Sequence, residues 1–129
     1  MHVPPGFTTV FPYIFAKDAH AYLAFLEAGL GGEIVGVHAN ADGTVANAQI
    51  RFNDTTIMVS EATADNPASQ ATYYIYVADA DATMARAVAA GGTQLMEVGD
   101  RVYGDRQGGV RDPQGNIWWI SQRLAAGPY

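Results

Sequence analysis

The stretch Tyr13-Ile14-Phe15-Ala16-Lys17-Asp18-Ala19 decides the fold, because the chain repeats its pattern as Tyr74-Ile75-Tyr76-Val77-Ala78-Asp79-Ala80. The same offset relates Ser60 to Ser121, and no gap is needed between these anchors. Self-similarity at a fixed offset is the signature of a structural unit that is used twice. We therefore expect two units of the same topology.

The first unit, residues 8–60, is predicted to fold as one strand, one helix and three further strands. Residues 8–16 are rich in β-branched and aromatic side chains, which favours a strand, and Asp18 stands at an N-cap position. The helix is predicted to end at Gly31-Gly32. Its apolar residues have helical spacing and are Ala19, Leu23, Leu26 and Leu30. The strands follow at residues 33–38, 45–52 and 55–60, with a tight turn at Asn53-Asp54.

The second unit, residues 71–123, is predicted to repeat this order after a polar linker at residues 61–70. Its elements are a strand at 71–77, a helix that Asp79 caps, a strand at 93–97, a loop at 98–107 and a last strand at 116–122. The residues that this helix is predicted to bury are Ala80, Met84, Ala87 and Gly91. Asp112-Pro113-Gln114-Gly115 has the composition of a type I turn before the last strand.

A four-stranded sheet with one helix leaves its other face uncovered. We therefore expect an α+β fold in which two βαβββ units form one domain, residues 1–129, as a curved mixed-sheet cup with the helices outside. Alternation along the strands then sorts the side chains. The cavity side is predicted to receive Phe11, Tyr13, Phe15, Met58, Ser60, Thr72, Tyr74, Tyr76, Trp119 and Ser121. The helix side is predicted to receive Ile14, Ile57, Val59, Ile75, Val77, Trp118 and Ile120.

The composition limits the possible partners. Thirteen Asp and Glu against seven Lys and Arg give a formal net charge of −6, which repels phosphate backbones, so we expect no nucleic acid partner. No apolar run is long enough to cross a membrane, and the first residues lack a signal-peptide pattern. We therefore expect a cytoplasmic protein. Without cysteine the chain has no disulfide and no thiolate site.

The chain resembles the vicinal oxygen chelate superfamily, and within it the glyoxalase/bleomycin-resistance branch with its PhnB-like proteins. Pro12-Tyr13-Ile14-Phe15 and Asp18-Ala19 are similar to the opening strand of that branch. Its closing signature is similar to Tyr103-Gly104-Asp105-Arg106, Arg111-Asp112-Pro113, Gly115 and Trp118. The resemblance covers residues 8–123. It implies a homodimer, with ligands bound in grooves at the interface between subunits.

Metal-dependent members of the superfamily bind a divalent cation through His, Gln or Glu at four strand positions. The resemblance places these positions at Phe11, Met58, Thr72 and Trp119, none of which suits such a cation. We therefore expect no metal and no other cofactor. Where many relatives have His-Ala-Glu, this chain has Asn47-Ala48-Gln49, so a titratable base is missing and we expect no catalytic residue.

The expected function is non-catalytic binding or sequestration of a small planar aromatic molecule, such as an antibiotic. Aromatic faces bind planar molecules by dispersion and quadrupole contacts. The candidate ligand-binding residues are Phe11, Tyr13, Phe15, Asn47, Gln49, Met58, Ser60, Thr72, Tyr74, Tyr76, Tyr103, Arg106 and Trp119.

Two alternative functions, and the role of one arginine, stay open from the sequence. One is a metal-dependent glyoxalase, lyase or dioxygenase with ligands elsewhere in the chain. Another is a dimeric module whose aromatic residues simply fill a closed core. At Gly104-Asp105-Arg106, the arginine either contacts a ligand or forms a local ion pair with Asp105, and the ion pair is favoured because such surface pairs are common.

Overall fold

Both predicted units are present in the computed structural model, which describes residues 2–129. The chain forms two compact units, one that ends at Ser69 and one that begins at Gln70 and also includes Ala28–Leu30, and each unit contains one four-stranded sheet. Within the described residues, neither helix is long and apolar enough to cross a membrane. Each unit combines one helix with one four-stranded sheet, so the fold is α+β, with one topology used twice.

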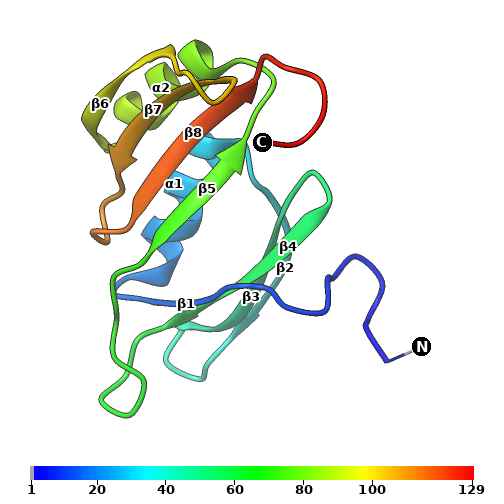
Figure 1. The fold of residues 1–129 in the computed structure, drawn as a ribbon. Coiled ribbons are helices and arrows are strands. Elements are labelled where there is room, and N and C mark those ends of the chain that lie inside the picture. Colours follow the sequence, from blue (N-terminus) through cyan, green and yellow to red (C-terminus); the bar gives the residue numbers. More distant parts are fainter. Residues whose placement is uncertain (1) are drawn as a thin grey trace. The chain divides into compact units, whose positions relative to one another are not determined.

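Unit one contains five elements in the predicted order (Figure 1). They are β1 (Tyr13–Ala16), α1 (Ala19–Leu30), β2 (Glu33–Ala39), β3 (Val45–Phe52) and β4 (Thr55–Glu61). The strands lie in the order β1-β4-β3-β2. The β1–β4 pair is parallel, whereas β3 pairs antiparallel with both β4 and β2. A parallel pair needs a crossover connection, and α1 forms part of it.

The helix α1 begins and ends where the sequence predicts. The carboxylate of Asp18 accepts a hydrogen bond from the backbone N–H of Ala21 at 3.3 Å. The carboxylate of Glu61, at the end of β4, accepts the N–H groups of Asp18 and Ala19, each at 2.9 Å. Gly31 ends the helix with a φ of 77°, a conformation that glycine adopts without a steric penalty.

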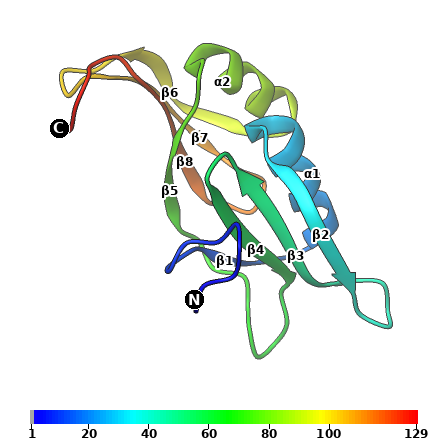
Figure 2. The same cartoon turned by 90° about the vertical axis from the view of Figure 1, so that its right-hand side faces the viewer.

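Unit two repeats the arrangement with β5 (Thr72–Tyr76), α2 (Ala80–Ala89), β6 (Thr93–Asp100), β7 (Asp105–Arg111) and β8 (Ile117–Arg123). The strands lie in the order β5-β8-β7-β6, with β5 parallel to β8. The helix α2 packs on β6, β7 and β8 and covers one face of this sheet (Figure 2). The carboxylate of Asp79 caps it by accepting the N–H of Ala82 at 3.0 Å.

Burial agrees with the predicted alternation for the apolar and aromatic side chains, although Ser60 and Ser121, predicted on the cavity side, are also buried. Ile14, Val59 and Ile120 are buried. Tyr13 and Tyr74, next to buried isoleucines on their strands, are 47% and 49% exposed. Each sheet therefore has an apolar helix side and an opposite side that carries aromatic rings. We call the second side the free face of each unit.

Three sequence predictions at the ends of elements are wrong. The first strand begins at Tyr13 rather than at residue 8, and Pro12, which has no N–H to donate to a ladder, directly precedes it. Residues 98–107 are not one loop, because β6 continues to Asp100 and β7 begins at Asp105. Gly91 is exposed and lies beyond α2, where its φ of 115° suits glycine.

The turn between β7 and β8 forms at the predicted residues. The N–H of Gly115 donates to the carbonyl of Asp112 at 3.0 Å, and Gly115 has a φ of 90°. Oδ1 of the Asp112 carboxylate accepts the N–H groups of Gln114 and Asn116, and Oδ2 accepts the indole N–H of Trp118, each at 2.9 Å. One buried carboxylate therefore holds the turn and the first part of β8 together.

Candidate functional site

On the free face of unit one, two aromatic rings from β1 stack on each other. The ring centroids of Tyr13 and Phe15 are 4.6 Å apart, with an angle of 27° between the planes. Residues two apart on a strand share a face, so the pair presents a continuous aromatic surface. Such a surface offers stacking contacts to a planar molecule.

Hydrogen bonds fix the orientation of the Tyr13 ring. The Ser60 hydroxyl donates to the carbonyl of Ala46 at 2.8 Å. Because a serine hydroxyl has one proton, the Tyr13 hydroxyl is then the donor in its 2.7 Å bond to Ser60. Asn47 donates from its amide to the Tyr13 oxygen at 3.3 Å. The ring is therefore positioned before any ligand arrives.

The amides of β3 complete this surface. The Asn47 amide also donates to the sulfur of Met58 at 3.6 Å, and Gln49 donates to the Asn47 carbonyl oxygen. A Cβ on Gly36 would clash with the Gln49 amide, so a glycine at this position leaves room for that side chain. Asn47, Gln49 and Met58 thus lie beside Tyr13, as the predicted site requires.

On the free face of unit two, the rings gather around a buried carboxylate. Asp105, the first residue of β7, is 0% exposed. Its Oδ2 atom accepts the hydroxyls of Tyr74 at 2.7 Å and of Tyr76 at 3.0 Å. Its Oδ1 atom accepts the guanidinium of Arg123 at 3.0 Å. The Tyr74 and Tyr76 rings are 49% and 48% exposed, so their hydroxyl ends are anchored while their faces stay open.

The remaining predicted residues of unit two form short polar contacts around this cluster. The indole N–H of Trp119 donates to the Thr72 hydroxyl at 2.9 Å. Tyr103 donates to the amide oxygen of Gln107, whose amide nitrogen donates to the Ser121 hydroxyl at 2.8 Å. The structure thus brings five predicted residues together on one face, namely Thr72, Tyr74, Tyr76, Tyr103 and Trp119.

The environment of Tyr74 changes its acidity. Desolvation raises the pKa of this hydroxyl far above the ordinary value of 10.0, and the hydrogen bond to Asp105 raises it further. Because the folded-state pKa lies above that of the unfolded chain, the associated stabilisation is complete below pH 10 and is lost as the pH rises above it.

We expect the Tyr74 hydroxyl to stay protonated throughout an alkaline titration of the folded protein. The measurement is tyrosinate absorbance against pH for the wild type and for Tyr74→Phe. The difference between the two curves should stay flat through pH 10 and rise only when the wild type unfolds. A difference that titrates near the ordinary value in the folded protein would contradict the anchoring of this hydroxyl.

Arg106 lies on the opposite side of the sheet from Tyr74 and Tyr76. Its guanidinium forms two bonds to Asp81 in α2, at 2.7 and 3.0 Å, and one to Asp100 at 2.9 Å. The arginine lowers the pKa of Asp81, and the two carboxylates raise the pKa of Arg106. The local ion pair predicted between Asp105 and Arg106 is wrong, because neighbouring residues in a strand point to opposite faces.

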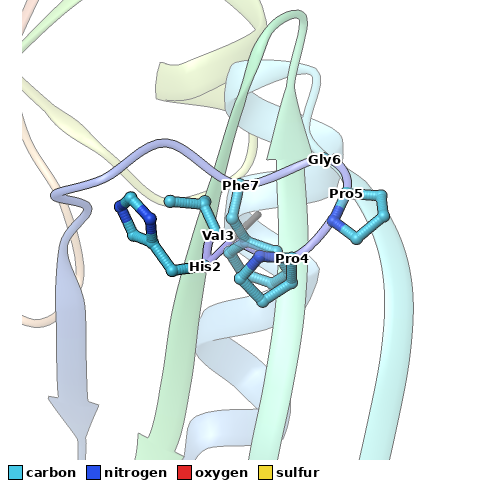
Figure 3. Close-up of a pocket in the computed structure, with 6 residues that line it drawn as sticks. All are labelled: His2, Val3, Pro4, Pro5, Gly6 and Phe7. Atoms are coloured by element: carbon cyan, nitrogen blue, oxygen red, sulfur yellow. The ribbon is translucent and has the colours of Figure 1, made fainter.

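Phe11 is also separated from the aromatic rings of β1. It lies before the strand and packs against Phe7, with ring centroids 5.0 Å apart. Phe7 itself lines an open hollow formed by residues 2–7 (Figure 3). None of the predicted ligand-binding residues lines this hollow. Its surface is made of two prolines, a glycine, a valine, Phe7 and His2, which offers few polar groups to orient a ligand.

The positions where the superfamily holds a metal do not fit one in this chain. Phe11 has no donor atom, and the indole nitrogen of Trp119 is a hydrogen-bond donor only. The Thr72 hydroxyl accepts that indole N–H, and the Met58 sulfur accepts the Asn47 amide. Within residues 2–129, no three His, Cys, Asp or Glu side chains group closely enough to hold a metal ion.

Four residues on the free face of unit two were not predicted from the sequence: Asp105 as an anchor, Gln107, Arg123, and Tyr129, whose hydroxyl also donates to Asp105. Asp105 and Gln107 lie in a stretch that was predicted to be a loop. Recognising it as a strand would have placed Asp105 and Gln107 together on one face. Arg123 is the last residue of β8 and Tyr129 lies beyond that strand. No pattern in the sequence marked either residue.

Two βαβββ units, each with one helix side and one free face that carries aromatic rings, define a glyoxalase-type fold. The chain belongs to the Glyoxalase/Bleomycin resistance protein/Dioxygenase superfamily, whose family model matches residues 7–120. An uncharacterized protein of Mycobacterium tuberculosis, Rv0887c, is 29% identical over 122 residues, which cover 86% of this chain and 72% of that protein.

Solved structures show the same fold. TioX from Micromonospora sp. ML1 matches with a TM-score of 0.76 at 21% identity, covering 91% of this chain and 99% of that one. TnmS3, an antibiotic binding protein from Streptomyces sp. CB03234, matches with a TM-score of 0.72 at 19% identity, covering 95% and 98%. At these identities the similarity establishes the fold alone.

Proposed function

We propose that this protein binds a small planar aromatic molecule, such as an antibiotic, and sequesters it without catalysis. One observation carries the proposal: tyrosine rings on both free faces are about half exposed, yet their hydroxyls are hydrogen-bonded. Tyr13 is held by Ser60, and Tyr74 and Tyr76 are held by Asp105. A ring fixed at one end and open on its face is preorganised for stacking.

The exposure of these rings supports a binding surface over a filled core. A core aromatic is buried on both faces, whereas Tyr13, Tyr74 and Tyr76 are 47%, 49% and 48% exposed. Each well-placed aromatic pair is worth about 0.5–1.5 kcal/mol beyond the area that it buries. Several such contacts, together with the burial of the ligand itself, are enough for sequestration.

The polar groups around the rings support binding without chemistry. On unit one they are the amides of Asn47 and Gln49 and the hydroxyl of Ser60. Amides and hydroxyls orient a ligand by hydrogen bonds, but they do not exchange protons near neutral pH as a general base must. On unit two, Asp105 is already bonded by three tyrosines and an arginine.

We propose that the ligand contacts predicted residues on the free face of each unit. They are Tyr13, Phe15, Asn47, Gln49, Met58, Ser60, Thr72, Tyr74, Tyr76, Tyr103 and Trp119.

We propose that the working form is a cytoplasmic homodimer with the ligand bound at the interface between subunits. The large exposed area of the three tyrosine rings supports this, since rings of this kind are enriched at interfaces. The antibiotic-binding neighbour TnmS3 supports the class of ligand.

Tryptophan fluorescence tests the proposal, because Trp119 lies on the free face and Trp118 lies on the helix side. Planar antibiotics of the bleomycin, quinoxaline and phenazine types should quench the emission with saturation. Trp119→Phe should remove most of the ligand-dependent signal, whereas Trp118→Phe serves as the matched control. Absence of saturable quenching, or stoichiometric nickel, zinc, iron or manganese in protein purified without chelator, would contradict the proposal.

A further inference from the structure

The segment after β8 folds back onto the free face of unit two (Figure 1). The N–H of Leu124 donates to the carbonyl of Gly104 at 2.8 Å, which anchors the start of this tail, residues 124–129. Arg123 then donates to the carbonyls of Gly127 and Pro128, at 3.1 and 3.2 Å. These bonds bring Tyr129 over the Asp105 cluster.

Tyr129 makes two specific contacts there. Its hydroxyl donates to Oδ2 of Asp105 at 3.1 Å. Its ring lies against the Arg123 guanidinium, with the central carbon 4.6 Å from the ring centroid, which is a cation–π contact. Two groups therefore bind the phenol ring of Tyr129. The Asp105 carboxylate accepts its hydroxyl, and the Arg123 guanidinium lies over its π face.

Tyr129 differs from the other two tyrosines on Asp105 in how it is held. Tyr74 and Tyr76 belong to β5, whose backbone is paired with β8. Tyr129 belongs to a segment without helix or strand, is 75% exposed, and makes the longest of the three bonds to Oδ2. The two β5 tyrosines are fixed parts of the cluster, whereas Tyr129 is the partner that is lost most easily.

We propose that Asp105 and Arg123 form a subsite for a neutral, hydroxyl-bearing aromatic ring, and that Tyr129 occupies this subsite until such a ligand displaces it. The inference rests on the proposed function and names the ligand class of the same face. A ligand ring that carries an O–H donor reproduces both contacts of Tyr129. A ring without that donor leaves Oδ2 of Asp105 with one partner fewer.

The charges of the subsite select a neutral ring. An anionic ring would meet the carboxylate of Asp105, and a cationic ring would meet the guanidinium of Arg123. The Asp105 carboxylate and the Arg123 guanidinium form an ion pair at 3.0 Å, so the subsite has no net charge from these two groups. A phenol-type hydroxyl, protonated near neutral pH, donates to the carboxylate and brings no charge of its own.

A matched pair of probes tests the subsite directly. The probes are 2-naphthol and 2-methoxynaphthalene, which share the ring system but differ in the O–H donor. Their affinities should be measured by calorimetric or fluorescence titration for the wild type, for Tyr129→Ala and for Val102→Ala. Val102 is a control in the same unit, because its side chain is fully exposed.

Removing the competing tyrosine should strengthen binding of 2-naphthol roughly 3- to 10-fold. The apparent affinity is the intrinsic affinity multiplied by the fraction of protein in which Tyr129 has left the subsite. Binding of 2-methoxynaphthalene should be weaker than that of 2-naphthol in the wild type and in Tyr129→Ala alike, because it lacks the O–H donor, and removal of Tyr129 should raise both affinities by a similar factor. Tyr129→Phe, which keeps the ring but loses the hydrogen bond to Asp105, should give an intermediate gain in affinity. Val102→Ala should leave both affinities as in the wild type.

Equal affinities of 2-naphthol and 2-methoxynaphthalene, or an affinity for 2-naphthol that is the same in the wild type, Tyr129→Phe and Tyr129→Ala, would overturn the subsite. If both probes still bound, the proposed aromatic binding would stand without it. Failure of 2-naphthol to bind Tyr129→Ala would also overturn the subsite, whereas the proposed function fails only if the planar antibiotics produce no saturable quenching.

Discussion

Asp105→Ala should lower the free energy of unfolding by about 3 kcal/mol, the largest effect that we expect from a single substitution. The wild-type carboxylate is fully buried and accepts bonds from Arg123, Tyr74 and Tyr76. Its removal takes away the only carboxylate that the structure pairs with Arg123 among the described residues and leaves the tyrosine hydroxyls without this acceptor. Urea denaturation monitored by circular dichroism measures the difference.

The matched control for this substitution is Asp81→Ala. Asp81 also pairs with an arginine, but its side chain is 58% exposed. Solvent screens an exposed pair of this kind, so Asp81→Ala should destabilise the protein much less than Asp105→Ala. If the two substitutions destabilised the protein equally, Asp105 would not be the anchor that the geometry indicates.

Asp112→Ala should have the second largest effect and lower the free energy of unfolding by about 2 kcal/mol. The Asp112 carboxylate accepts two backbone N–H groups in the β7–β8 turn and the indole N–H of Trp118. All three donors lose their partner in the alanine variant, and two of these bonds are buried.

Asp112→Asn separates the contributions of the turn and the indole. Its amide oxygen can still accept the N–H groups of Gln114 and Asn116, but its amide nitrogen cannot accept from Trp118. We expect a loss smaller than that of Asp112→Ala, measured by the same urea denaturation. Equal losses for the two variants would show that the turn bonds contribute nothing.

The repeat and the alternation of side chains predicted most of the fold. Asp18 and Asp79 cap their helices as expected, because a helix N-terminus has unpaired N–H groups that only a few side chains satisfy. The buried positions of Ile14 and Ile120 followed from the period of a strand. Such local rules operate within a few residues, so a single sequence carries them.

The first residues of β7, Asp105 to Gln107, were predicted as loop, because they carry no β-branched or aromatic side chain. Asp105 begins that strand, and its bonds to Tyr74 and Arg123 join residues far apart in the chain. No local pattern marks such a contact. Burial of a carboxylate depends on partners that only the tertiary structure brings together.

The two adjacent tryptophans provide the most direct test of binding at the free face. The indole N–H of Trp119 bonds to Thr72 on that face, whereas the indole N–H of Trp118 bonds to Asp112 on the helix side. In a two-dimensional ¹H–¹⁵N spectrum, addition of a planar antibiotic that quenches the fluorescence should shift the Trp119 indole signal and leave the Trp118 signal in place. A shift of Trp118 alone, or no shift of either signal at saturating ligand, would contradict binding at the free face.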